Sequence, residues 1–343
     1  MTGTSASGAV FVQSNEPENR VIAFARSDDG ALTEVGTYET GGAGDAKPHL
    51  TSQGSVVLTG DGRQLLVANA ASDDVSVFAV AADVSLHLIG RTSAGSAPKS
   101  ITERDGLVYV LATGKPAVLG FRLDEGGLQP IPGGEQALAA LDVDPAQIGF
   151  GADGSVLVVT ERGTNSVTTL AVDGDGQAGP PSSVPSSGPT PYGFAVTSSG
   201  TLVVTEAFGA QKGGAAVSSY RLDRTTVTPL TRSAGNGRSE ICWAVVTPDD
   251  RFVFTTNCAD GAVSCYGVDA DGTLRLVDAT AGVTVDGRAG LRDECLSADG
   301  RYLYTIDADA GAVFGWTVGR DGSLAALGSW SGLPETVAGL AAR

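Results

Sequence analysis

Two acidic residues end near-identical segments of this 343-residue chain. The run LVVTE occupies Leu157 to Glu161 and returns at Leu202 to Glu206, 45 residues further on. An acid at the end of an apolar run stands at the edge of buried surface, where the loss of water makes a carboxylate a better proton acceptor. Glu161 and Glu206 are therefore candidate general bases. The alternative is a structural ion pair, for instance between Glu161 and Arg162.

The two acids belong to a longer repeat that positions them. Turn dipeptides begin at Asp61, Asp105, Asp153, Ser199, Asp249 and Asp299, at spacings of 44, 48, 46, 50 and 50 residues. Each turn is followed by an apolar run, such as QLLVAN or SVLVVTE, and then by an alternating run, such as DVSVFAV or SVTTLAV. Several units add a second turn and a further strand pattern. Four strands per unit of about 40 to 50 residues are typical of a β-propeller blade.

The two ends of the chain complete one another. The N-terminal GAVFVQ has a second-strand pattern with no first strand before it, and the C-terminal TVAGLAAR has a first-strand pattern with nothing after it. Pairing the two ends would leave neither as an exposed edge. The sequence therefore predicts an all-β fold: a seven-bladed β-propeller of four-stranded antiparallel blades, closed by the terminal strands. All 343 residues form a single domain in this interpretation.

Composition limits the partners of the protein. Proteins that bind nucleic acids need clustered Lys and Arg, so the formal charge of -17 argues against a nucleic acid as partner. The N-terminus lacks a signal-peptide pattern, and no run of about 18 apolar residues could span a bilayer, so we expect a cytoplasmic protein without membrane contact. The four cysteines lack metal-ligand spacing. We expect a monomer or weak oligomer with a small-molecule substrate, no metal and no cofactor.

The predicted blades place polar residues on one face of the disc. Tight turns follow the first and third strands at one face, so the longer connections lie at the other, where binding residues collect. Besides the two acids, His49 is a candidate general base, with a structural loop role as the alternative. The candidate substrate-binding residues are Arg292, Tyr192, Trp243, Asn257, Gln147, Lys99, Asn69 and Asp307. Acids, cations, amides and aromatics of this kind suit a small polar ligand.

Several segments resemble a known family. LTGDGRQLLVANAASDDVSVFAV, PYGFAVTSSGTLVVTEA and LSADGRYLYTIDADAGAVFGWTV are similar to bacterial members of the lactonase family of seven-bladed propellers. That family includes 6-phosphogluconolactonases and fungal carboxymuconate lactonizing enzymes. The resemblance implies a His, Arg and Glu group at the looped face, with Glu206 or Glu161 in the place of the Glu. The places expected for the His hold Lys99, Gln147 and Gly193, so the His is not carried over.

Three functions follow from these patterns. The first is hydrolysis of a small anionic lactone, in which Glu206 or Glu161 activates water and Arg292 or Tyr192 stabilises the carbonyl oxygen. The second is cycloisomerisation of an unsaturated carboxylic acid, where the same Glu moves a proton without attack by water. The third is a non-catalytic propeller that binds a small molecule or a protein.

Overall fold

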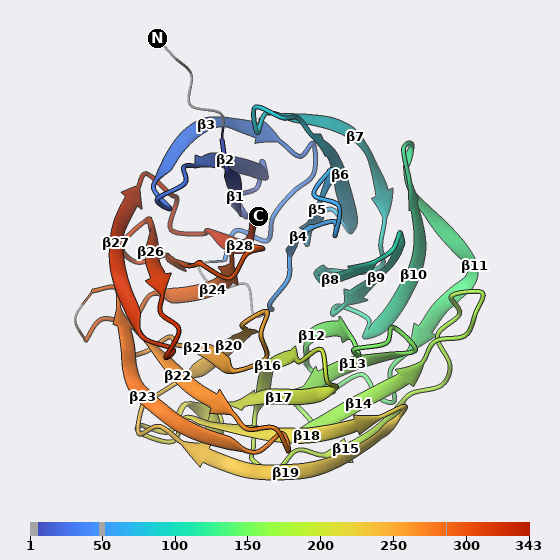
Figure 1. Cartoon of the computed structure of the whole chain (residues 1–343). Helices are drawn as coiled ribbons and strands as arrows, with labels where there is room; N and C mark the ends of the chain where they lie inside the picture. The colour runs from blue at the N-terminus through green and yellow to red at the C-terminus, as the bar shows by residue number, and fades with distance from the viewer. Residues whose placement is uncertain (1–5, 48–51, 286) are drawn as a thin grey trace.

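The computed structural model describes residues 6–47, 52–285 and 287–343. Seven four-stranded antiparallel sheets stand in a ring, as Figure 1 shows, and the predicted all-β, seven-bladed propeller is confirmed. The blades are numbered here from the N-terminus, and each runs from an innermost first strand to an outermost fourth strand. In the described part of the chain the sole helical segment is the 3₁₀ turn η1 (Phe208–Ala210).

The first three blades take up the N-terminal part of the chain. Blade 1 contains β28 (Ala338–Ala342), β1 (Gly8–Gln13), β2 (Arg20–Arg26) and β3 (Leu32–Glu39); blade 2 contains β4 (Val56–Leu58), β5 (Gln64–Asn69), β6 (Asp74–Val80) and β7 (Leu86–Ser93); blade 3 contains β8 (Pro98–Arg104), β9 (Leu107–Ala112), β10 (Ala117–Asp124) and β11 (Gly127–Ala137).

The other four blades follow in chain order. Blade 4 contains β12 (Pro145–Phe150), β13 (Val156–Glu161), β14 (Ser166–Ala171) and β15 (Ser182–Pro185); blade 5 contains β16 (Pro191–Val196), β17 (Thr201–Glu206), β18 (Ala216–Asp223) and β19 (Thr226–Gly235); blade 6 contains β20 (Ile241–Val246), β21 (Phe252–Asn257), β22 (Ala262–Val268) and β23 (Leu274–Val283); blade 7 contains β24 (Leu291–Leu296), β25 (Tyr302–Asp307), β26 (Ala312–Val318) and β27 (Leu324–Ser331).

The ring closes as the sequence predicts. The C-terminal strand β28 pairs with the N-terminal strand β1, with Val10 opposite Ala342 and Val12 opposite Leu340. Both ends of the described chain therefore lie in blade 1, and this pairing protects what would otherwise be two open edges.

Apolar layers between neighbouring blades form the core. Between blades 4 and 5, for example, Val158 and Val167 pack against Phe194, Leu202 and Tyr220, all of them buried. Second strands are buried on both faces, which explains their near-continuous apolar runs. Burial of this kind stabilises a folded chain by roughly 25 cal/mol per Å² of apolar surface.

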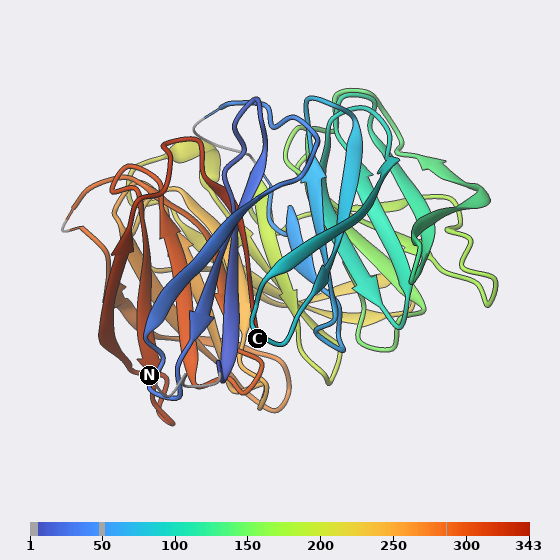
Figure 2. The same ribbon diagram turned by 90° about the horizontal axis from the view of Figure 1, so that it is seen from above.

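The two faces of the disc differ. Tight turns containing Gly62, Gly154 or Gly300 lie at one face, seen edge-on in Figure 2. Arg343 lies at the same face, where its Nη1 donates to Gly62 O at 2.8 Å. The longer connections lie at the opposite face, called the looped face below, which includes η1 and residues 287–290. Candidate binding residues therefore need to reach the looped face near the propeller axis.

A β-bulge recurs near that end of the innermost strands. In β8, β12, β16, β20 and β24 the register against the second strand shifts, and one or two residues stay out of the ladder. The residues left out are Lys99, Ala146, Tyr192 with Gly193, Cys242 with Trp243, and Arg292 with Asp293. Because a bulge redirects its side chains, five consecutive blades place residues with altered direction at the same end of their first strands.

Candidate functional site

The threonines of the LVVTE segments hold the bulges in place. The Thr160 hydroxyl donates to the carbonyl of Tyr192 in the next blade. Thr205 Oγ1 accepts a hydrogen bond from Gly193 N at 2.9 Å and donates to Cys242 O at 2.7 Å, again in the next blade. Both hydroxyls are fully buried. The repeated segment therefore fixes the backbone from which Tyr192 and Cys242 project.

The acids of the same segments point the opposite way. Glu206 Oε1 accepts hydrogen bonds from Gly188 N at 2.7 Å and from the Ser218 hydroxyl at 2.7 Å, and Oε2 accepts one from Ser233 at 2.6 Å. Ser218 and Ser233 belong to the third and fourth strands, so the carboxylate of Glu206 faces outward, away from the axis. Its fully buried oxygens are occupied, which argues against a role as general base.

Glu161 has a similar environment in blade 4. Its Oε1 accepts from Thr168 at 2.7 Å and its Oε2 from Thr164 at 2.8 Å, and the residue is 1% exposed. Hydroxyl groups rather than Arg162 are thus its partners. The assignment of Glu161 or Glu206 as a base stays a prediction, and the geometry favours a structural role for both.

Asn69, Asn257 and Asp307 end their second strands as Glu206 does, and all four form part of the seam between blades. Each accepts a hydrogen bond from the residue directly after the fourth strand of the preceding blade. The donors are Thr40 to Asn69 at 2.9 Å, Ser186 to Glu206 at 3.2 Å, Asn236 to Asn257 at 3.0 Å, and Thr284 to Asp307 at 2.7 Å. These candidates therefore join neighbouring blades and do not gather at the axis.

Gln147 and Gln53 make a second set of contacts between blades, at the innermost strands. The amide of Gln147 exchanges two hydrogen bonds with the backbone of Phe194 in the next blade, at 2.7 and 3.0 Å. Gln53 makes the same pair of bonds to Ala244, at 3.1 and 3.2 Å, but reaches from blade 2 to blade 6 across the ring. The segment that contains Gln53 thus crosses the axis beneath the looped face.

Gly193 makes room for this crossing. A Cβ atom added at Gly193 would lie 2.5 Å from Cys242 O and 2.8 Å from Gln53 Oε1. Neither distance is tolerable for real atoms, so a side chain at this position is incompatible with the bridge formed by Gln53.

Three cations on the looped face each have an aspartate partner. Lys99 Nζ lies 3.6 Å from Asp45 Oδ2, Arg162 Nη2 lies 2.6 Å from Asp144 Oδ1, and Arg292 Nη2 lies 3.6 Å from Asp309 Oδ1. The three cationic side chains are only about 15% exposed. We call these six residues the charged rim. Of the predicted residues, Lys99 and Arg292 belong to it.

Tyr192 and Trp243 lie beside the charged rim. Arg162 donates to the Tyr192 hydroxyl at 2.9 Å and its guanidinium lies 4.7 Å from the ring centre. The Trp243 ring meets the Tyr192 ring edge-on, with the centres 4.9 Å apart. Both aromatic residues are buried, so they support Arg162 from below more than they offer open surface. His49 lies outside the described residues.

Burial changes the proton affinity of two of these groups. It lowers the pKa of Lys99, an effect opposed by Asp45 and strengthened by the nearby charges of Lys47 and Arg162. Burial also raises the pKa of Tyr192 well above its usual value, with a further contribution from Cys242. Asp45 Oδ2 receives no hydrogen bond from the described residues. Lys99 therefore releases its proton more readily than an exposed lysine does.

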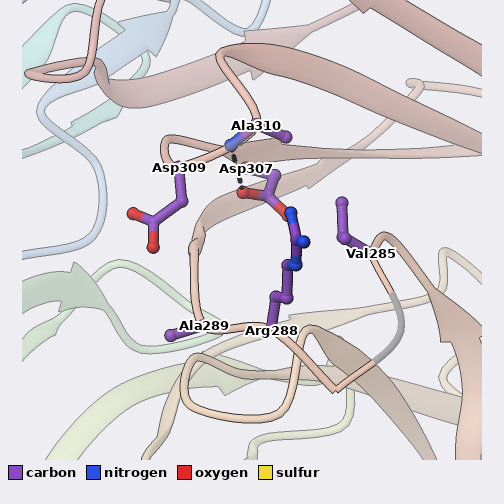
Figure 3. Close-up of a pocket in the computed structure, with 6 residues that line it drawn as sticks. All are labelled: Val285, Arg288, Ala289, Asp307, Asp309 and Ala310. Carbon is purple, nitrogen blue, oxygen red and sulfur yellow. Dashed lines mark hydrogen bonds between the residues drawn. The ribbon is translucent and has the colours of Figure 1, made fainter.

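A cavity of about 320 Å³ adjoins the charged rim at blade 7. It is lined by Val285, Arg288, Ala289, Asp307, Asp309 and Ala310, which Figure 3 shows as sticks. Asp309 belongs to both the cavity and the rim. Asp307 accepts a hydrogen bond from Ala310 N at 2.9 Å, so its carboxylate is fixed by the loop that forms one wall.

The sequence analysis missed several residues of this region. Asp45, Asp144, Asp309 and Gln53 lie on connections, where strand periodicity carries no information, and nothing in the sequence pattern distinguishes Cys242 from the other three cysteines. A group of His, Cys, Asp and Glu able to hold a metal does not occur among the described residues. A helix long and apolar enough to cross a membrane is likewise missing from the part of the chain that the structure describes.

Solved structures similar to this one include lactonases and candidate lactonases. A candidate 6-phosphogluconolactonase from Bacteroides fragilis has a TM-score of 0.75 at 17% identity, over 100% of this chain and 99% of its own. The periplasmic gluconolactonase PpgL of Pseudomonas aeruginosa has a TM-score of 0.74 at 14% identity, over 98% of each chain. A Lactobacillus plantarum protein has the same TM-score and identity, over 98% of this chain and 99% of its own. At such identities the likeness shows the fold alone.

Sequence comparison defines the family. No curated protein matches the chain. The family model described as lactonase, seven-bladed beta-propeller, matches residues 5–132, 117–228 and 205–331, which together span nearly the whole sequence. The chain therefore belongs to the lactonase family of seven-bladed β-propellers.

Proposed function

We propose that the protein hydrolyses a small, negatively charged lactone at the looped face. The observation that carries the proposal is the charged rim, in which three blades contribute Lys99, Arg162 and Arg292 to the looped face. Family membership supports the reaction class. Guanidinium groups bind carboxylates and phosphates through paired hydrogen bonds, so Arg162 and Arg292 are the groups we assign to the substrate anion.

Lys99 and Asp45 supply the proton transfers in this proposal. Asp45 takes a proton from the water molecule that attacks the carbonyl carbon, and Lys99 gives a proton to the ring oxygen as the C–O bond of the ring breaks. The product is a hydroxy acid. Passage of a proton from Asp45 to Lys99, 3.6 Å away, restores both groups. The lowered pKa of Lys99 favours its role as acid, because it releases a proton more readily than an exposed lysine.

A matched pair of lactones tests the proposal. The purified protein is assayed with a six-membered sugar lactone and with its phosphorylated analogue, and hydrolysis is followed by acid release. We expect kcat/KM to be at least about tenfold higher for the anionic lactone, which corresponds to about 1.4 kcal/mol of binding. Arg162→Gln should remove this preference, and Arg63→Gln, whose side chain is 84% exposed at the tight-turn face, should not.

Two results would overturn it. One is equal hydrolysis of both lactones with no effect of Arg162→Gln. The other is absence of oxygen-18 from the product when the reaction runs in labelled water, since ring opening by water introduces solvent oxygen and cycloisomerisation does not.

A further inference from the structure

Two of the four cysteines form a close pair beside the charged rim. Cys258 Sγ lies 3.0 Å from Cys242 Sγ, closer than two unbonded sulfur atoms normally approach. Cys242 is a bulge residue of β20, and Cys258 directly follows β21, the strand paired with it. Both residues are 3% exposed. They belong to one buried cluster with Tyr192 and Trp243.

We infer that Cys242 and Cys258 are a modification site, at which a peroxide reversibly converts the two thiols into a disulfide. A disulfide needs a sulfur separation of about 2.0 Å, so each sulfur atom has to move by only about half an ångström. The bulge makes this approach feasible, because it takes Cys242 out of the ladder and turns its side chain toward the second strand.

The chemistry balances with the peroxide as the sole oxidant. Cys258 sulfur attacks one oxygen of hydrogen peroxide, the O–O bond breaks, and one water molecule leaves with the thiol proton. The Cys258 sulfenic acid is then attacked by Cys242 sulfur, the S–S bond forms, and the S–O bond breaks to release a second water. Two thiols and one peroxide thus give one disulfide and two waters. A dithiol reductant reverses the step by thiol exchange.

The order of attack follows from the surroundings. The hydrogen bond that Cys242 shares with Cys258, together with burial, raises the pKa of the Cys242 thiol well above its usual value, although the charge of Arg292 opposes this. Cys242 is therefore a poor source of thiolate, and the first attack on the peroxide is assigned to Cys258. Because both thiols are only 3% exposed, hydrogen peroxide, which is small, suits the site better than a bulky disulfide reagent.

The other two cysteines serve as internal controls. Burial raises the pKa of Cys265 and of Cys295 to about 12, and neither thiol has another cysteine as its hydrogen-bond partner among the described residues. The chain has a single methionine, Met1. Oxidation elsewhere is therefore easy to distinguish by mass.

The test counts thiols in the folded full-length protein. After exposure to hydrogen peroxide, the protein is denatured and titrated with a thiol reagent. We expect the number of free thiols to fall from four to two, with the mass lower by two hydrogen atoms, and a dithiol reductant to restore all four. Peptide mapping should join the peptides of Cys242 and Cys258. Cys265→Ser should still lose two thiols, whereas Cys242→Ser should form no internal disulfide.

Other outcomes would overturn the inference: four thiols remaining after peroxide, sulfinic or sulfonic acids in place of a disulfide, or a bridge between two copies of the chain. A further readout is the fluorescence of Trp243, which a neighbouring disulfide should quench and which Cys258→Ser should preserve. Any change of lactone turnover on oxidation rests on the proposed function. The thiol count does not, so the two proposals fail separately.

Discussion

Gln53 and Ala244 are 191 residues apart in sequence, yet the amide of Gln53 exchanges two hydrogen bonds with the backbone of Ala244 across the propeller axis. At the equivalent place, Gln147 makes the same pair of bonds to its immediate neighbour blade. In blade 5 the position equivalent to Gln147 is Gly193, which has no side chain to bond Ala244 of blade 6. The missing side chain of Gly193 in blade 5 is thus replaced by that of Gln53, which comes from blade 2.

Gln53→Ala should lower stability because it leaves the buried N–H and C=O groups of Ala244 without partners. A loss of about 1 to 3 kcal/mol is expected, and Gly193→Ala should have a similar effect because its Cβ collides with the same bridge. Urea unfolding measures both. Gln129→Ala, at an exposed position of β11, is the control and should leave the midpoint unchanged.

Glu206→Gln distinguishes a structural acid from a catalytic one. An amide places a donor where the carboxylate accepts hydrogen bonds from serines and a backbone amide, so stability should fall by about 1 to 3 kcal/mol. Turnover per folded molecule should change little. A loss of turnover of roughly 100-fold or more with unchanged unfolding would instead identify Glu206 as the base.

Thr205→Val and Thr255→Val form a matched pair. Thr205 bonds two bulges, whereas Thr255 Oγ1 has no partner among the described residues and takes the place that Val204 has in blade 5. We expect Thr205→Val to destabilise the protein by about 1 to 3 kcal/mol and Thr255→Val to be neutral or stabilising. Thermal unfolding of both variants, at one pH, gives the comparison. Equal effects would refute the role given to Thr205.

Glu294→Leu should stabilise the protein. Glu294 is 2% exposed, and neither carboxyl oxygen has a partner among the described residues. It occupies the inter-blade position that holds Ile148 in blade 4 and Phe194 in blade 5. Replacing an unpaired buried carboxyl by an apolar group should add roughly 1 to 3 kcal/mol at neutral pH. A lower urea midpoint for the variant would contradict this.

The same residue should produce a pH dependence of stability. Burial, then the charge of Asp293, raises the pKa of Glu294 well above its usual value, and burial raises the pKa of Asp293 to about 7. The folded state therefore keeps protons on these two groups that the unfolded state has released, so their contribution to stability is greatest below their unfolded pKa values and falls as pH rises toward the folded values. Urea midpoints at about pH 5 and about pH 8 should differ less in Glu294→Leu than in the natural protein.

Lys99 should set the alkaline limit of turnover under the proposed mechanism. Because its pKa is lowered, activity should decline at a lower pH than an ordinary lysine would give. Lys99→Arg should move that decline to higher pH, while Lys99→Met should reduce kcat by roughly 100-fold. Lys115→Met, at an exposed lysine of the same blade and face, is the control. A pH profile unchanged by Lys99→Arg would remove Lys99 from the mechanism.

The fold could be predicted from the sequence because each blade repeats the same pattern of turns and apolar runs. The missing first strand at one end and the extra one at the other even predicted the pairing of β28 with β1. The direction of side chains at strand ends could not be read in this way. Glu206 is adjacent to Thr205, and successive residues of a strand point to opposite sides. The acid therefore points toward the outer strands of blade 5, and the threonine toward the bulges of the first strands.

The candidate site was predicted only where it lies on strands. Lys99, Tyr192 and Arg292 occupy bulges of first strands, and all three are among the substrate-binding residues predicted from the sequence. Their partners Asp45, Asp144 and Asp309 lie in loops whose course depends on the closed ring. One usable signal was overlooked: a polar residue follows the fourth strand wherever a second strand ends in Asn69, Glu206, Asn257 or Asp307. Aligning those two positions would have identified the seams.

The recurrent bulge has a consequence for how such a protein changes over time. Residues outside the ladder contribute little to strand pairing, so Lys99, Ala146, Tyr192, Cys242 and Arg292 occupy positions that can be substituted one at a time without breaking the ladder. Under the proposed function, such substitutions would change the charged rim and the buried residues beneath it while the seven sheets stay the same.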